Sequence, residues 1–366
     1  ANAMAVNLDH VLSLGAKQTF IYDPSHGMED LEMGILRPVS LSNIEEDPVR
    51  ILRGFRIAHQ KRLSLSEEFI TFAKKKSHIM KKSSPERITQ EFFRCFIGEG
   101  SAKVIKSLYD IGILQELFPE TSRWEEVKDK SQELPLSEHI FRVIDALEGV
   151  IKRAQEFLPE DAIEKQGEFL GEFSEFELTK LSALFHDVAK PHTYKIVDGK
   201  PTFHGHDVLG EEIVRKYAKT YRWGKDVEEF VAKMVRHHLR MFFLREAKLK
   251  KELTDRAKYR FWKDCEDIAH YLFLHSLADS IASNDSDSHI ESLIELYKEL
   301  LEFKSKTGEQ ISALLSGDEI MEILKINQGP RVGRLKQVLI EAQIEGKVKT
   351  KDEAIEFLRQ IASRDE

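Results

Sequence analysis

Apolar residues recur every three or four positions through most of the chain, which is the spacing of one face of an α-helix. The first such stretch starts near Ile44, and Ser84-Pro85-Glu86 marks a helix start inside it, because proline is favoured in a first helical turn. Its apolar positions are Ile51, Leu52, Phe55, Ile57, Ala58, Phe69, Ile70, Phe72, Ala73, Ile88, Phe92, Phe93 and Phe96. The pattern predicts a mainly α protein.

A second helical stretch begins near Ser137, whose side chain is expected to cap the helix that follows. Its predicted helices cover 138–147, 178–189, 211–218, 227–238 and 268–282. Residues 152–178 are acidic and contain proline and glycine, which predicts a loop or an insertion. The last stretch, 311–361, has Gly329-Pro330 between helical runs and is predicted to form a small terminal helical unit.

The first forty residues differ from this pattern. Residues 4–8 and 19–22 are short strand-like runs, and Asp23-Pro24 closes the second one. Because an isolated pair of strands is marginally stable in water, we expect this segment to be the edge of a larger sheet or a flap against the helices.

Composition narrows the class of protein and the kind of metal site. No stretch approaches the roughly 18 apolar residues of a membrane span, and the first residues lack a signal peptide, so we expect a cytoplasmic protein that does not contact membranes. The only cysteines are Cys95 and Cys265, too few for a disulfide framework or a cysteine zinc site. Any metal would therefore be bound by histidines and carboxylates.

Charge is unevenly distributed along the chain. The net charge is −8, yet the segment 47–106 holds 14 Lys and Arg against 6 acids and is +8, which leaves −16 elsewhere. This asymmetry predicts a local anionic partner. The lysines predicted to bind RNA are Lys74, Lys75, Lys76, Lys81 and Lys82, although a solvated helix face is an equally good interpretation of these five alone.

Histidines and aspartates interrupt the apolar runs of the second stretch. The positions are His139, His186, Asp187, His206, His237, His238 and Asp279. A single histidine such as His139 is more often an ordinary core residue, but adjacent ionisable groups in a strongly apolar helix are costly unless they are paired or bind a metal. His186-Asp187 therefore predicts a metal site, and Asp279 is the same anomaly on another apolar helix.

Imidazole and carboxylate ligands without thiolate suit divalent Mn, Ni, Co, Zn, Fe or Mg. With a coordination position open to water, such a site hydrolyses phosphate esters. His186, Asp187 and Lys190 are the predicted catalytic residues, and Lys190 would hold a phosphate as a point charge. An ordinary cation at a helix end is an equally good interpretation of Lys190.

The order His139, His186-Asp187-x-x-Lys190, Asp279 resembles the HD-domain metal-dependent phosphohydrolases. Phe203-His-Gly-His206 and Arg236-His-His238 resemble the branch with additional histidines. The resemblance implies metal ligation by His139, His186, Asp187, His206, His238 and Asp279, with His237 the weaker candidate of its pair. Ala189 stands where many members have glycine.

A second resemblance covers nearly the whole chain. Its motifs are Asp23-Pro-Ser-His-Gly27, Asp30-Leu, Gly34-Ile-Leu-Arg37, Glu46-Asp-Pro-Val-Arg50-Ile-Leu-Arg53, Glu86-Arg-Ile, Gly329-Pro-Arg-Val-Gly333 and 346–354. Together they resemble the bacterial tRNA nucleotidyltransferase and poly(A) polymerase family. In that family an Asp and an Arg on the neck helix read the base edge of the incoming nucleotide, and here they correspond to Asp47 and Arg50. Three residues apart, these two would share a helix face and match the donors and acceptors of cytosine or adenine, and Arg53 and Arg56 would extend that face toward phosphate.

One departure from the family is large. Its polymerases carry an N-terminal head with paired aspartates that bind two Mg ions, and this sequence has no room for it. Three explanations stay open: an engineered truncation with a tag remnant at Ala1–Ala3, a split enzyme whose head is a separate chain, or a degenerate protein. We therefore expect no polymerase activity from this chain alone.

The resemblances imply a multi-helical neck, body and tail with an inserted HD-type helical domain and a short β-containing remnant of the head. The expected boundaries are 1–40 for the remnant, 41–130 for the neck and body, 131–300 for the HD domain and 301–366 for the tail. The implied function is RNA 3′-end processing, with the tRNA acceptor end and CTP or ATP as partners, and with phosphatase or 2′,3′-cyclic phosphodiesterase chemistry at the HD site. A non-catalytic RNA-binding body and a free-nucleotide hydrolase are the alternatives.

Overall fold

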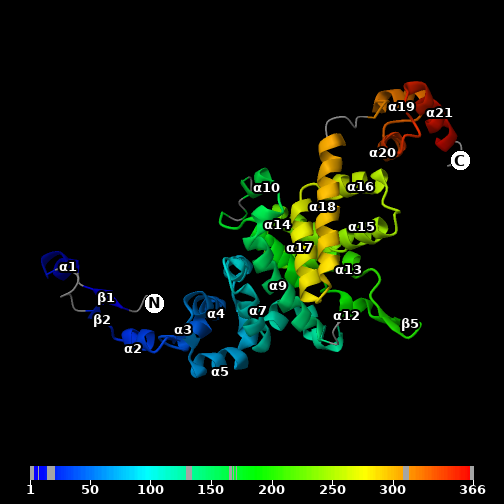
Figure 1. Cartoon of the computed structure of the whole chain (residues 1–366). Helices are drawn as coiled ribbons and strands as arrows, with labels where there is room; N and C mark the ends of the chain where they lie inside the picture. Colours follow the sequence, from blue (N-terminus) through cyan, green and yellow to red (C-terminus); the bar gives the residue numbers. More distant parts are fainter. Residues whose placement is uncertain are drawn as a thin grey trace. The chain divides into compact units, whose positions relative to one another are not determined.

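The computed structural model describes residues 4–6, 8–14, 21–128, 134–164, 167, 169, 171–307 and 313–362. It is mainly α-helical, as the apolar spacing predicts, with strands only in short pairs among the described residues (Figure 1). The chain divides into two compact units, the first made of 1–238 with 278–284 and the second of 239–277 with 285–366. In the part of the chain that the structure describes, no helix is both long enough and apolar enough to cross a membrane.

The predicted N-terminal strands are present but short. β1 (Ala5–Val6) pairs antiparallel with β2 (Ile21–Tyr22), and the start of the second predicted run, at 19–20, lies outside the described residues. Leu8, expected at the end of the first strand, instead begins helix α1 (Leu8–Leu14). Helix α2 (Gly27–Glu32) follows, and β3 (Ile35–Leu36) pairs parallel with β4 (Ser64–Leu65).

The basic segment of the first unit is a set of short helices. They are α3 (Ser42–Glu46), α4 (Val49–Lys61), α5 (Glu67–Lys75), a 3-10 helix over Ser77–Lys82, α6 (Pro85–Phe93), α7 (Ser101–Asp110) and α8 (Ile113–Leu117). The expected start of α6 is confirmed, with Ser84 at the N-cap and Pro85 in the first turn. Aromatic residues fill the core here: the Phe92 ring centroid lies 5.6 Å from that of Phe96 and 5.1 Å from that of Phe118.

The rest of the first unit carries the histidines. Its elements are α9 (Leu136–Lys152), α10 (Glu160–Glu164), α11 (Glu175–Phe185), α12 (Lys190–Thr193), β5 (Lys195–Val197), β6 (Lys200–Thr202), α13 (His206–Tyr221), α14 (Lys225–His237) and the end of α17 (Ala269–Ala282). The expectation that Ser137 caps α9 is wrong, because the helix begins at Leu136 and Ser137 lies inside its first turn. The Ser137 hydroxyl instead donates a hydrogen bond to the Glu125 carboxylate at 2.5 Å. The acidic segment 152–178 includes the short helix α10.

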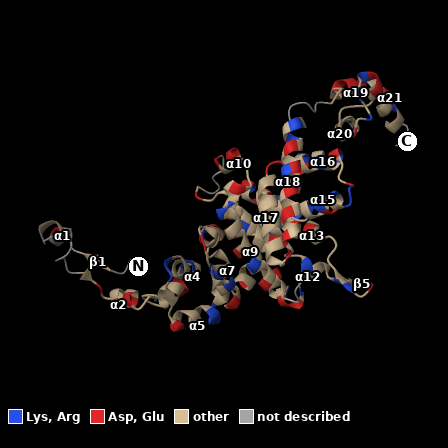
Figure 2. Cartoon of the chain, in the orientation of Figure 1, with Lys and Arg blue, Asp and Glu red and all other residues tan. Residues whose placement is uncertain are grey.

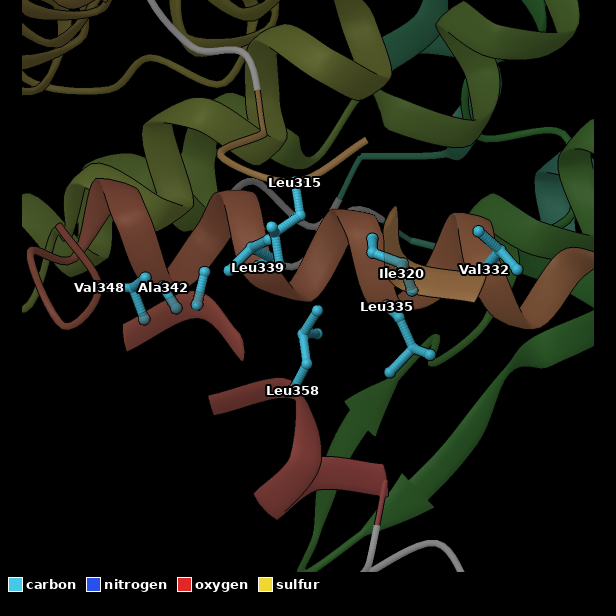
Figure 3. Close-up of a cluster of buried hydrophobic side chains, with 9 residues drawn as sticks. Leu315, Ile320, Val332, Leu335, Leu339, Ala342, Val348 and Leu358 are labelled. Atoms are coloured by element: carbon cyan, nitrogen blue, oxygen red, sulfur yellow. The ribbon is translucent and has the colours of Figure 1, made fainter. Parts of the chain in front are cut away.

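The second unit contains α15 (Arg240–Leu249), α16 (Asp255–Cys265), most of α17, α18 (Asp287–Thr307), α19 (Gly317–Leu324), α20 (Pro330–Ile344) and α21 (Lys351–Ala362). Its last three helices share a hydrophobic cluster that includes Ile320, Leu339 and Leu358, all fully buried (Figure 3). The predicted helix start after Gly329-Pro330 is confirmed at α20. Buried Glu341 on α20 accepts hydrogen bonds from Arg256 and Arg260 of α16, which joins the two helices.

Candidate metal centre and nucleotide-binding segment

The histidines and aspartates of the predicted metal site come from separate elements of the first unit. His139 lies on α9, His206 begins α13, His238 directly follows α14, and Asp279 lies on α17. His186 and Asp187 lie in a turn, because α11 ends at Phe185 and the helix predicted over 178–189 stops four residues early.

The Asp187 carboxylate lies at the centre of the cluster. Its Oδ1 lies 3.2 Å from Nε2 of His206 and 3.6 Å from Nε2 of His238. Its Oδ2 lies 3.1 Å from Nε2 of His186 and 3.9 Å from Nε2 of His139. The two oxygens thus face two different groups of histidines. The Asp187 carboxylate is therefore positioned to contribute a ligand to each of two neighbouring metal ions.

Two further groups complete the cluster. Asp279 Oδ1 lies 3.2 Å from Nε2 of His139, and the Lys190 ammonium lies 2.5 Å from Asp187 Oδ2. The side chains of Asp279 and Lys190 are 15% and 16% exposed, whereas those of His139, His186, Asp187, His206 and His238 are at most 7% exposed. Solvent therefore reaches the cluster on the side of Asp279 and Lys190. His237 is half-buried and belongs to neither ligand group.

Backbone carbonyls fix the orientation of three of the rings. Nδ1 of His186 donates to the carbonyl of Ala183 at 2.8 Å, and Nδ1 of His206 and of His238 donate to the carbonyls three residues earlier, at 2.7 Å each. This pairing leaves the Nε2 lone pairs directed into the cluster, as in metal-binding histidines. The Nε2 atoms of His206 and His238 are only 3.1 Å apart, and two such lone pairs repel unless a proton or a cation lies between them.

The donor set fits a divalent metal. Ligand bonds of about 2.0–2.2 Å in tetrahedral or octahedral geometry place neighbouring ligand atoms about 2.8–3.6 Å apart. The distances from Asp187 and Asp279 to the facing nitrogens lie close to that range. Nitrogen with carboxylate oxygen suits borderline and hard divalent ions.

Protonation of the cluster follows from its burial and its pairing. Burial opposes ionisation of Asp187, but the charges of His186 and Lys190 and the hydrogen bonds from His186 and His206 outweigh it and hold the pKa of Asp187 well below its usual value. Burial likewise lowers the pKa of His238. For His139 and His206, burial is outweighed by hydrogen bonds to Asp279 and Asp187, so their pKa values are raised. A metal ion entering the cluster would displace protons from these rings.

Close packing of two helices places His206 and His238. The two residues lie at the start of α13 and just past the end of α14, which pack side by side. Gly210 of α13 lies at the closest approach, because a Cβ added there would be 2.9 Å from a methyl group of Val235. A larger residue at this position would push apart the helices that hold both histidines.

The predicted base-reading pair is close together but arranged differently from the prediction. Asp47 and Arg50 were expected to share one helix face, yet Asp47 follows the end of α3 with non-helical backbone angles (φ −135°, ψ 80°), and α4 begins after Pro48. A residue before proline is disfavoured in helical conformation, which explains the break. Asp47 Oδ2 nevertheless lies 3.2 Å from Nε of Arg50 and 2.8 Å from the guanidinium of Arg87 on α6.

A buried glutamate that the sequence analysis missed holds the other two predicted arginines. Glu91 on α6 accepts hydrogen bonds from Arg53 at 2.8 Å and from Arg56 at 3.1 Å, and Arg94 donates to it at 2.9 Å. Its side chain is 4% exposed. The signal in the sequence was a carboxylate on the apolar face of a helix, between Ile88 and Phe92. The guanidinium of Arg56 is thus engaged inside the protein.

A cavity of about 330 Å³ lies beside the start of α4. Its lining includes Arg50, Arg53, Gly54 and the Phe69 ring. Glycine is required at position 54, because a Cβ there would lie 2.7 Å from the ring of Phe69. The volume is within the range of small-molecule sites, and three arginines, Arg37, Arg50 and Arg53, line it. An anionic ligand with an aromatic part would fit this cavity.

The five predicted RNA-binding lysines lie on α5 and on the 3-10 helix after it, and Figure 2 draws blue ribbon beside the α5 label. Lys76 pairs with Glu45 at 3.0 Å and Lys81 with Glu116 at 2.8 Å. Within the described ranges, Lys74, Lys75 and Lys82 are exposed and form no ion pair. Of the five lysines, these three are therefore the ones available to bind an external anion.

Two family models match separate parts of the chain. Residues 136–284 match the HD domain, and residues 62–125 match the probable RNA and SrmB-binding site of polymerase A. The first match contains all six residues of the candidate metal centre, and the second contains the five lysines on α5 and the following 3-10 helix.

Similar proteins add nucleotides to tRNA. The chain is 29% identical to a CC-adding tRNA nucleotidyltransferase of Thermus thermophilus, over 90% of this chain and 70% of that protein. It is 26% identical to an A-adding tRNA nucleotidyltransferase of Deinococcus radiodurans, over 93% of this chain and 74% of that protein. It is also 30% identical to a multifunctional CCA protein of Neisseria meningitidis, over 60% of this chain and 48% of that protein.

Solved structures have the same fold. An apo CCA-adding enzyme superposes with a TM-score of 0.55 at 16% identity, covering 97% of this chain and 68% of that one. A CCA-adding enzyme with ATP superposes with a TM-score of 0.54 at 17% identity, covering 100% of this chain and 70% of that one. Over at least 90% of its length the chain is similar to CC-adding and A-adding tRNA nucleotidyltransferases, and its residues 136–284 form an HD domain.

Proposed function

We propose that this chain binds RNA 3′ ends and hydrolyses a terminal phosphate ester, such as a 2′,3′-cyclic phosphate or a 2′-phosphate, at the His/Asp cluster. The observation that carries the proposal is the set of Nε2 atoms directed at the two oxygens of Asp187, with three rings oriented by backbone carbonyls. His139, His186, Asp187 and Asp279 would hold one divalent ion, and Asp187, His206 and His238 a second.

Each group of the cluster has a role in this proposal. A bound divalent metal would activate water and neutralise phosphate oxygens. Lys190, the partly exposed cation beside Asp187, would bind a substrate phosphate oxygen from the solvent side. Water would attack the phosphorus atom, the bond to one ribose oxygen would break, and that oxygen would take up a proton. A cyclic phosphate would give a phosphomonoester, and a 2′-phosphate would give a free 2′-hydroxyl and inorganic phosphate.

Metal binding and turnover are tested together. Elemental analysis after reconstitution with Mn, Ni, Co, Zn or Mg should find stoichiometric metal, and 2′,3′-cyclic CMP should be hydrolysed. Asp187→Asn keeps the shape of the side chain but removes the anionic ligand, so metal content and turnover should both be lost. Asp207→Asn, a partly exposed aspartate that pairs with Arg236, is the matched control. Substoichiometric metal in the wild type across this series would contradict the proposal.

RNA binding is assigned to the exposed lysines of the basic segment. Lys74→Glu/Lys75→Glu should weaken RNA binding and flatten its dependence on salt, because fewer counterions are released, while cyclic nucleotide hydrolysis continues. Lys219→Glu/Lys225→Glu makes the same charge change at exposed positions on α13 and α14. Equal losses of RNA affinity in both double variants would mean that net charge alone, and not this segment, drives binding.

The cavity beside α4 favours a second function, recognition of CTP or ATP. Arg50 and Arg53 line the cavity, and Asp47 forms an ion pair with Arg50. A carboxylate acceptor beside a guanidinium donor matches the mixed edge of cytosine or adenine. Equilibrium binding of labelled CTP and ATP should be lost in Asp47→Ala and kept in Asp145→Ala, an aspartate on α9. Unchanged affinity in Asp47→Ala would refute this assignment.

A further inference from the structure

A short antiparallel hairpin follows the catalytic lysine. β5 and β6 pair with Lys195 opposite Thr202 and Val197 opposite Lys200, and the segment 194–203 that contains them is called here the 194–203 hairpin. It begins four residues after Lys190. Tyr194 is 45% exposed and Ile196 is 65% exposed. An aromatic ring left in solvent beside a candidate active site suggests contact with a ligand.

Ring contacts connect the hairpin to the metal centre. The Lys190 ammonium lies 5.4 Å from the centroid of the Phe203 ring, and that centroid lies 5.8 Å from the centroid of the Tyr194 ring. The carbonyl of Phe203 accepts the hydrogen bond that orients the His206 ring, at 2.7 Å. The Phe203 end of the hairpin therefore contacts two groups of the centre, and the Tyr194 ring packs on that end, on the Lys190 side.

The hairpin is also basic in an acidic protein. Residues 190–203 hold Lys190, Lys195 and Lys200 against Asp198, whereas the whole chain carries −8. Cross-strand pairing puts Lys195 and Lys200 on one face of the hairpin, because Lys195 and Val197 are two residues apart and Val197 pairs with Lys200. The basic colouring around β5 in Figure 2 reflects these lysines. Tyr194 precedes Lys195 and points to the opposite face, so a ligand that contacts the ring and both lysines must cross an edge of the hairpin. Aromatic rings together with cations are the combination that binds single-stranded nucleic acid.

We infer that the 194–203 hairpin binds the last nucleotides of a single-stranded RNA 3′ end, with Tyr194 stacking on a base and with Lys195 and Lys200 contacting backbone phosphates. The inference rests on the proposed hydrolysis at the metal centre, for which it names the substrate contacts. The base of the substrate is then recognised by the 194–203 hairpin, which contains none of the candidate metal ligands. The hydrolase then prefers nucleotide esters over phosphate esters that lack a base.

Kinetics with and without a base test the stacking contact. Tyr194→Ala in the Mn-reconstituted full chain should raise the KM for 2′,3′-cyclic AMP about tenfold, because stacking on an aromatic side chain contributes roughly that factor. The KM for ribose 2′,3′-cyclic phosphate without a base should stay unchanged. Tyr194→Phe, which keeps the ring, should behave as the wild type with both. An equal rise for both substrates, or no rise for either, would overturn the inference.

Photocrosslinking separates this inference from the proposed hydrolysis. An RNA hexamer that ends in 4-thiouridine is irradiated with the full chain, and the crosslinked peptide is identified by mass spectrometry. Crosslinks within 194–203 that disappear in Lys195→Glu/Lys200→Glu support the hairpin even if no ester is hydrolysed, in which case only the hydrolase proposal fails. Crosslinks confined to other segments overturn the hairpin inference, whether or not hydrolysis occurs.

Discussion

Replacing Glu91 with glutamine should destabilise the first unit through three arginines. The change keeps the size of the side chain but removes the charge that Arg53, Arg56 and Arg94 share. Arg53 is 46% exposed and can be hydrated, whereas Arg56 is only 16% exposed. Arg56 would therefore be left as a largely buried cation without its carboxylate partner.

The magnitude follows from the burial of these groups. Removing one partner of a fully buried ion pair costs about 3–5 kcal/mol, and a hydrogen bond to a charged group contributes about 1.5–3 kcal/mol. Because Arg53 regains water and glutamine keeps one acceptor oxygen, we expect about 2 kcal/mol for Glu91→Gln. Glu156→Gln is the control, since its pair with Arg153 lies on the surface, where such pairs contribute little to stability.

The effect should depend on pH in a defined direction. Burial by itself raises the pKa of Glu91, but the hydrogen bonds and charges of Arg53 and Arg56 outweigh burial and lower it below the ordinary 4.5. A carboxyl whose pKa is lower in the folded state stabilises the protein fully above its unfolded pKa. The stability difference between wild type and Glu91→Gln should be complete at pH 7 and shrink below about pH 4.5.

Urea unfolding followed by tryptophan fluorescence measures this difference. Trp262→Phe removes the tryptophan of the second unit, so the remaining signal reports on the first. Trp223 is a local probe, because its ring centroid lies 5.3 Å from that of Phe93 on the helix of Glu91. A difference between wild type and Glu91→Gln no larger than that of Glu156→Gln, or one unchanged between pH 7 and pH 4, would refute the reasoning.

Three further predictions concern the metal centre and the packing of each unit. Gly210→Ala should separate α13 from α14 at Val235 and reduce the metal bound by His206 and His238. Gly149→Ala is the control, because a Cβ added there meets no neighbouring group within 4 Å; it should leave the metal content unchanged and raise stability by about 0.5–1 kcal/mol. Elemental analysis measures the metal content, and thermal melts measure the stability. Leu339→Ala should destabilise the last three helices by about 2–5 kcal/mol in hydrogen exchange, without changing metal content. Chelation of the metal should lower the Tm of the wild type but not that of Asp187→Asn.

The sequence determined the helical elements and the chemistry of the candidate site. Apolar spacing located α4, α6, α11, α14 and α17, and the proline rule located the starts of α6 and α20, because these signals depend only on residues close together in the chain. A His-Asp pair in an apolar run predicted an unusual site, and the motifs identified the family. The ligand assignments of the individual residues stay predictions.

Boundaries and partners needed the tertiary structure. The break at Asp47 follows from the local signal of Pro48, but α11 ends at Phe185 inside an apolar run that continues to Ala189, and local propensity contains no information about that boundary. The same holds for Glu91, whose partners on α4 lie 35 and 38 residues away in sequence. Burying a charge is costly, so its position is decided by which opposite charges the packed helices bring within reach, and only the folded chain fixes those distances.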